Sequence, residues 1–153
     1  ESLADIISRC CQIKTSYVNQ DEKEKGARAL LNLGHTFAHA IEAYTNYQQF
    51  LHGEAVAIGL YCAAILSNIC GYAKKDIITH IDQLLKRAKL PRRIQPNWSK
   101  HILLKLMKQD KKVLDNRLRL IALSKAGHCF IDDTVTEDQI MKTLQLATEG
   151  VDE

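Results

Sequence analysis

The sequence predicts a mainly α-helical protein, a multi-helix domain with one small β-hairpin. Three observations indicate this fold class. Only 7 Gly and 2 Pro interrupt the 153 residues, and aromatic residues make up just 6%. Apolar residues recur at helical spacing through most of the chain. With 46% hydrophobic and 25% charged residues, a chain of this length can bury a core without a disulfide or a metal ion to hold it together.

The N-terminal third predicts two helices. Ser2 can cap the first, over about 2–18, because a serine hydroxyl accepts a hydrogen bond from an unpaired amide of the first turn. The charged run that ends at Gly26 breaks the chain, and a second helix follows over about 27–47. The first helix carries one apolar face at helical spacing, made of Leu3, Ile6, Ile7, Cys10 and Ile13.

Three further helices are expected in the middle of the chain. The third covers 54–69 and stops at Gly71, a residue suited to the left-handed conformation that ends helices. A fourth covers 75–88 before Pro91, and a fifth covers 99–108.

The C-terminal part predicts the hairpin and a last helix. Two short apolar runs, 118–123 and 128–131, are joined by Ala126-Gly127 and are typical of paired strands. Thr136 then starts a helix that ends near Gly150.

Charge and targeting signals restrict the function classes. The net charge of +3 helps to attract an anionic substrate but lacks the strength of a nucleic-acid binder. No glycine pattern forms a dinucleotide- or phosphate-binding loop. The apolar run 55–70 is too short for a comfortable membrane span, and we expect no signal peptide. The five cysteines form no C-x-x-C pair, which favours buried free thiols in a cytoplasmic protein.

A polar stripe lies on the second predicted helix. At about 100° per residue, Arg28, Asn32, His35 and His39 fall within roughly 60° of one another. The opposite face carries Leu30, Leu33, Phe37 and Ile41. A solvated surface would be rich in Lys and Glu, whereas this stripe offers groups that recognise anions and metal ions. The sequence therefore predicts a ligand site on this helix.

Three histidines are candidate metal ligands. His35 and His39 lie one helical turn apart and could reach one zinc ion, but Thr36 stands where the H-E-x-x-H motif of a protease needs Glu. His52 begins the third helix, where a role as helix cap or as metal ligand stays open. Close packing through Gly34, Gly53 and Gly59 would let His35 and His52 face one ion.

Two motifs resemble the C-terminal domain of the 3-dehydroquinate synthase family. They are RALLNLGHTFAHAIE, residues 28–42, and LHGEAVAIG, residues 51–59. The similarity continues upstream through 13–14 and 21–26 and downstream through 110–113 and 118–120, so it covers nearly the whole chain. Ala38 replaces the glycine that is usual in the family, a change that affects packing more than chemistry.

The resemblance implies a shikimate-pathway lyase that turns 3-deoxy-D-arabino-heptulosonate 7-phosphate into 3-dehydroquinate and phosphate, with NAD and a divalent metal, usually zinc. Residues 1–153 would form the helical metal- and substrate-binding domain, without the N-terminal NAD-binding domain. The metal ligands would be His35 and His52, together with a Glu from a segment absent from this chain. The isolated chain should then be inactive, and the full-length enzyme should be a cytoplasmic homodimer that binds neither nucleic acid nor membrane.

The resemblance also implies roles for further residues. His39 matches a residue of the proton-transfer and phosphate-contacting machinery, and Glu24 matches a second acid/base. The positions that match substrate-binding residues are Lys14 and Arg28 at the carboxylate end and Asn32, His39 and Lys111 or Lys112 at the phosphate end.

Two other interpretations stay open. The chain could belong to a related sugar-phosphate cyclase or a metal-dependent polyol dehydrogenase of similar helical architecture. It could instead be a non-enzymatic helical module that binds nucleic acid or another acidic partner through a basic patch, Lys86, Arg87, Lys89, Arg92 and Arg93. That interpretation leaves the stripe of Arg, Asn and His unexplained.

Overall fold

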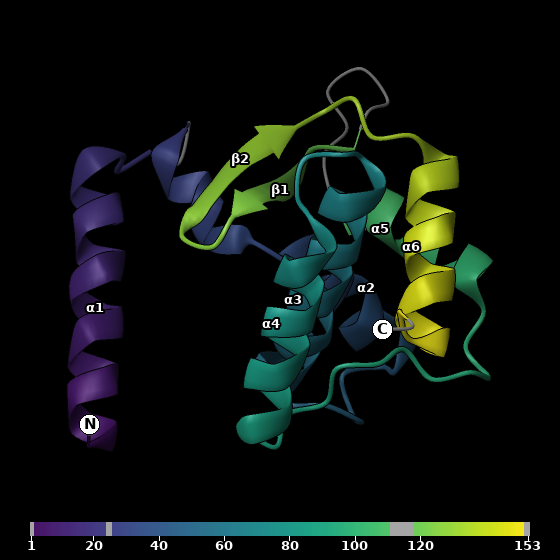
Figure 1. Cartoon of the computed structure of the whole chain (residues 1–153), viewed down its shortest axis with the longest axis horizontal. Coiled ribbons are helices and arrows are strands. Elements are labelled where there is room, and N and C mark those ends of the chain that lie inside the picture. The colour runs from purple at the N-terminus through teal and green to yellow at the C-terminus, as the bar shows by residue number, and fades with distance from the viewer. Residues whose placement is uncertain (1, 24–25, 111–117, 152–153) are drawn as a thin grey trace. The chain divides into compact units, whose positions relative to one another are not determined.

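The computed structural model describes residues 2–23, 26–110 and 118–151 (Figure 1). Contacts between residues divide the chain into two compact units, Glu1–Asn32 and Leu33–Glu153. The assignment of residues 1–153 to one helical domain stays a prediction.

The first unit contains the α-helix α1, Leu3–Gln20, and the 3-10 helix η1, Ala27–Asn32. The predicted N-cap of α1 is confirmed. The Ser2 hydroxyl accepts from the Asp5 amide at 3.3 Å, and the Asp5 carboxylate accepts from the Ser2 amide at 2.9 Å. This reciprocal pair satisfies two amides of the first turn. The predicted apolar face, however, is not buried: Leu3 is 72% exposed and Ile7 54%.

The second unit contains the remaining elements, and their type confirms the predicted fold class. Five α-helices and a two-stranded antiparallel hairpin are described here. The hairpin turns at Gly127, whose φ of +78° favours glycine. The elements are α2 His35–Tyr44, α3 His52–Ile69, α4 Lys75–Arg87, α5 Lys100–Asp110, β1 Leu120–Lys125, β2 His128–Asp132 and α6 Glu137–Glu149.

Helix α3 forms the centre of the second unit, with α2, α4, α6 and β1 packed against it (Figure 1). Eleven of its residues are buried. Its length and hydropathy would suffice to cross a membrane, but 61% of it is already covered by the rest of the protein. This confirms the prediction of a core helix. Its buried Ser67 hydroxyl accepts the Leu123 amide at 2.8 Å and so ties α3 to the hairpin.

The prediction of one continuous helix over 27–47 is wrong. The chain forms η1, then places Gly34 at a φ of +79°, and α2 begins only at His35. A left-handed residue cannot continue a right-handed helix. Arg28 and Asn32 therefore do not share one helix with His35 and His39, as was expected.

The prediction of buried cysteines holds for part of the chain only. All five thiols are free, and Cys62 is buried in α3, with Cys70 and Cys129 partly buried. Cys10 and Cys11 are exposed because α1 buries none of its residues within the described structure.

Candidate functional site

Three imidazoles gather where α2 and α3 begin. His35 and His39 lie one turn apart on α2, and His52 is the first residue of α3. The ring centres of His35 and His52 are 5.4 Å apart, those of His35 and His39 5.8 Å, and those of His39 and His52 6.3 Å. The structure therefore brings together the three histidines that the sequence singled out.

Two glycines allow the helices to approach closely enough for this cluster. A Cβ atom on Gly59 would lie 2.2 Å from the Gly34 carbonyl oxygen, and a Cβ on Gly34 would lie 2.7 Å from the Gly59 carbonyl carbon. Any side chain at either position would push the backbones apart. The same expectation for Gly53 is wrong, because a Cβ there would meet nothing within 4 Å among the described residues.

The His35 ring is held through one nitrogen. Its Nδ1 lies 3.3 Å from the Leu33 carbonyl oxygen, which can only accept a hydrogen bond, so Nδ1 carries the proton. Burial lowers the pKa of His35, and the nearby His39 and His52 act in the same direction. A neutral ring with its proton on Nδ1 leaves the Nε2 lone pair for a metal ion.

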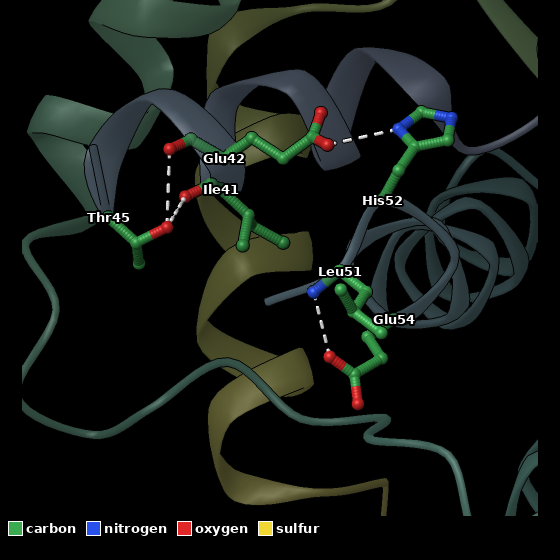
Figure 2. Close-up of polar contacts among 6 residues, drawn as sticks. All are labelled: Ile41, Glu42, Thr45, Leu51, His52 and Glu54. Atoms are coloured by element: carbon green, nitrogen blue, oxygen red, sulfur yellow. Dashed lines mark hydrogen bonds and ion pairs between the residues drawn. The ribbon is translucent and has the colours of Figure 1, made fainter. Parts of the chain in front are cut away.

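The His52 ring is also held through Nδ1, by a side chain that sequence reasoning missed. Figure 2 shows the Glu42 carboxylate of α2 directed at this ring, with Oε1 3.0 Å from Nδ1. His52 does not cap α3. That role falls to Glu54, whose carboxylate accepts the Leu51 amide at 2.8 Å. The one available signal for Glu42 was its position, seven residues after His35 and so on the same side of α2.

The chemistry of these donors fits part of a metal site. Metal-binding histidines commonly donate their second ring N–H to a carboxylate or a backbone carbonyl. His35 has such a carbonyl partner, Leu33, and His52 has such a carboxylate partner, Glu42. Catalytic zinc sites use three protein ligands. Among residues 2–23, 26–110 and 118–151, no three His, Cys, Asp or Glu side chains are arranged to bind one metal ion. The chemistry of His35 and His52 therefore fits two ligands of a metal site.

The other predicted site residues lie outside the unit that holds this cluster or outside the described residues. Lys14, Arg28 and Asn32 lie in the first unit. Lys14 is exposed on α1, and the Arg28 guanidinium donates to the Glu22 carbonyl at 2.8 Å. Their roles stay predictions. So do those of Glu24, Lys111 and Lys112, which lie outside the described residues.

The basic patch considered as an alternative is partly used within the fold. Arg92 and Arg93 both donate to the Asp82 carboxylate, at 2.8 and 2.7 Å. The Arg93 guanidinium also lies 4.1 Å from the centre of the Tyr61 ring. Two of its five cations therefore have structural partners, which weakens the case for a dedicated acidic-partner surface.

Comparison with known proteins gives the family. The family model described as 3-dehydroquinate synthase C-terminal matches residues 1–113. This chain belongs to the 3-dehydroquinate synthase family. The 3-dehydroquinate synthase of Legionella pneumophila (strain Lens) is 52% identical over 145 residues, or 95% of this chain. The chain spans only 39% of the length of that relative.

Two solved structures share this fold. A 2-epi-5-epi-valiolone synthase from Streptomyces hygroscopicus, with NAD⁺ and Zn²⁺ bound, matches with a TM-score of 0.83 at 20% identity. A 2-deoxy-scyllo-inosose synthase complexed with carbaglucose-6-phosphate, NAD⁺ and Co²⁺ matches with a TM-score of 0.80 at 25% identity. Each match covers 95% of this chain, and 40% and 41% of the respective solved chains. The helical unit with its hairpin is thus the architecture of one part of these larger synthases.

Proposed function

We propose that this chain is the metal- and substrate-binding C-terminal part of a 3-dehydroquinate synthase. The complete enzyme converts 3-deoxy-D-arabino-heptulosonate 7-phosphate to 3-dehydroquinate and phosphate. The observation that carries the proposal is the pair of His35 and His52, 5.4 Å apart, each held through Nδ1 with Nε2 left for a metal ion. The 52% identity to a curated 3-dehydroquinate synthase supports the choice of substrate.

The proposed cofactors are a divalent metal, such as zinc, and NAD. The metal would be held by His35 and His52 and a third ligand from a preceding segment, and would polarise a substrate hydroxyl as a Lewis acid. NAD, bound mainly by a preceding domain, would oxidise that hydroxyl and so make the neighbouring C–H acidic. The chain's own contribution is to orient the sugar phosphate and to move protons.

The other predicted site residues would move protons or bind the substrate. His39 lies 5.8 Å from His35 between ring centres and would move a proton next to the phosphate. Glu24 would serve as a second acid/base. Fixed cations and amides suit an anionic substrate, so we assign the carboxylate end to Lys14 and Arg28 and the phosphate end to Asn32, His39 and Lys111 or Lys112.

The related-cyclase alternative is less well supported. The two solved synthases with other substrates are 20% and 25% identical to this chain, against 52% for the dehydroquinate synthase. An assay with several sugar phosphates separates these activities directly. Product formation from another sugar phosphate but not from the heptulosonate phosphate would overturn the proposed substrate.

The decisive experiment assays phosphate release and dehydroquinate formation by the full-length protein with NAD and Zn²⁺. We expect His35→Ala and His52→Ala to reduce kcat/KM at least about 10³-fold, because each removes a metal ligand. His80→Ala, an exposed histidine on α4, is the matched control and should retain activity. The 153-residue chain alone should be inactive. Full activity of either ligand variant would overturn the proposed metal site.

Assembly and location follow the same proposal. We propose a cytoplasmic homodimer for the full-length enzyme, with no nucleic-acid or membrane partner. The five free thiols are compatible with a reducing compartment. Light scattering of the purified full-length protein measures its mass, and a monomer at micromolar concentration would contradict the dimer.

A further inference from the structure

Glu42 is a buried acidic residue on a helix otherwise packed into the core. The residue is 8% exposed, and its neighbours Ala40 and Ile41 are 2% and 1% exposed. Burying a carboxylate costs free energy unless its hydrogen bonds are made, and a leucine or alanine would pack here without that cost. Stability of the α2–α3 pair therefore does not explain an acid at this position.

The contact that Glu42 makes is with an exposed ring. The His52 side chain is 58% exposed, whereas that of Glu42 is 10% exposed. An exposed histidine on the first turn of a helix would sample several ring orientations and both tautomers. The Glu42 carboxylate, held by the core packing of α2, is 3.0 Å from Nδ1 of His52 (Figure 2). It therefore selects one ring orientation and one tautomer of His52.

We propose that Glu42 is the positioning residue for His52: it accepts the Nδ1 proton and thereby presents Nε2 as the metal-binding nitrogen. This inference rests on the proposed metal site. The Nδ1 of His35 is instead held by a backbone group, the Leu33 carbonyl oxygen at 3.3 Å, which no side-chain substitution removes. His52 is different, because its orientation depends on a single side chain that comes from another helix.

The consequence for metal binding follows from the charge and the geometry. A carboxylate that accepts from a ligating imidazole fixes the ring and raises the basicity of the other nitrogen. Loss of such a partner weakens metal binding by roughly 10- to 100-fold. We expect Glu42→Ala to show the full effect. Glu42→Gln should show a smaller one, because its amide oxygen can still accept from Nδ1 but carries no charge.

Two measurements on the full-length protein test this role. Competition with a chromophoric chelator gives the Zn²⁺ affinity, and the visible absorption of the Co²⁺ form reports the geometry around the metal. Glu54→Gln is the matched control, since this carboxylate lies two residues from His52 but accepts the Leu51 amide instead. We expect Glu54→Gln to keep the Zn²⁺ affinity within about twofold and the Co²⁺ spectrum unchanged, while Glu42→Ala changes both.

A third measurement needs no metal. In protein labelled with ¹⁵N-histidine at pH 8, the wild type should show His52 with its proton on Nδ1. Glu42→Ala should shift that proton towards Nε2, and Glu42→Leu, which fills the same space without an acceptor atom, gives the same test if the alanine variant does not fold. A His52 tautomer and a Zn²⁺ affinity unchanged in both variants would overturn the positioning role. Zn²⁺ binding unaffected by His52→Ala would instead overturn the proposed metal site itself.

Discussion

Helices α1 and α3 are both 18 residues long, yet they are stabilised in different ways. Helix α1 has a complete capping box at Ser2 and no buried residue. Helix α3 has no polar side chain at its N-cap position, Leu51, and buries eleven residues against its neighbours. Local rules thus suffice to begin a helix, but only α3 gains the packing energy that holds a fold and a site together.

The largest expected effect lies at the closest approach of α3 to its neighbour. Gly59→Ala would place a methyl group 2.2 Å from the Gly34 carbonyl oxygen, so the backbones must separate. We expect the free energy of unfolding to fall by about 4 kcal/mol, near the upper end for single substitutions. Urea unfolding measures it. Gly53→Ala, with nothing within 4 Å of the new Cβ, is the control and should stabilise by up to about 1 kcal/mol.

A matched pair of truncations compares the two helices directly. Leu66 of α3 is 0% exposed, whereas Ile7 of α1 is 54% exposed. Leu66→Ala should cost about 3 kcal/mol because it leaves a cavity in the core. Ile7→Ala should change the unfolding free energy by no more than about 0.5 kcal/mol. Equal effects in thermal or urea unfolding would show that α1 is covered in the natural protein.

The polar link between α3 and the hairpin should have an intermediate effect. Ser67 is fully buried, donates to the Ala63 carbonyl at 2.6 Å and accepts the Leu123 amide at 2.8 Å. Ser67→Ala leaves that amide without its partner, so we expect a loss of about 2 kcal/mol. Hydrogen exchange at Leu123 should accelerate more than exchange at Ile121. Unchanged exchange at Leu123 would show that the bond contributes nothing.

The smallest expected change in stability comes from a cysteine of α3, and the cysteines also allow α1 and α3 to be compared by their chemical reactivity. Burial raises the pKa of the Cys62 thiol to about 12 from an ordinary 9.0. A raised pKa stabilises the folded protein below pH 9, and this contribution is lost as the pH rises from 9 towards 12. The stability advantage of the wild type over Cys62→Ala should fall by about 1.4 kcal/mol between pH 8 and pH 10. A stability difference between the wild type and Cys62→Ala that stays constant from pH 8 to pH 10 would contradict the raised pKa of Cys62.

Thiol labelling at pH 8 completes that test. Cys10 and Cys11 of α1 are exposed and should react with a disulfide reagent within seconds to minutes. Cys62 should react only after unfolding, because its thiol is buried and protonated. Rapid labelling of Cys62 in the native protein would mean that α3 is not the closed core described above.

Much of the fold was predictable from local signals. Ser2 and Thr136 cap helices as expected, Gly71 follows α3 with a positive φ, and Gly127 turns the hairpin. Each of these depends on one residue and its immediate neighbours. The break in the predicted helix over 27–47 had no signal in the sequence, because helical periodicity continues through Gly34. The Gly34 backbone is nevertheless left-handed and packs on Gly59.

The candidate site also contains residues that the sequence predicted and one whose role it did not predict. His35, His39 and His52 were recognised from their residue types and spacing, and their rings lie within 6.3 Å of one another. Glu42 was part of the quoted motif but had no predicted role, because its partner is ten residues away on another helix. In α1 the spacing predicted an apolar face, but the sequence of this helix did not show that none of its residues is buried.

Composition, periodicity and capping residues were enough to predict which segments are helical and which side chains carry chemistry, because those properties arise within a few residues of chain. The meeting of two backbones at Gly34 and Gly59, and of a buried acid with an exposed imidazole, required the folded protein. Both are contacts between separate helices, where packing geometry outweighs any preference that a residue has within its own segment.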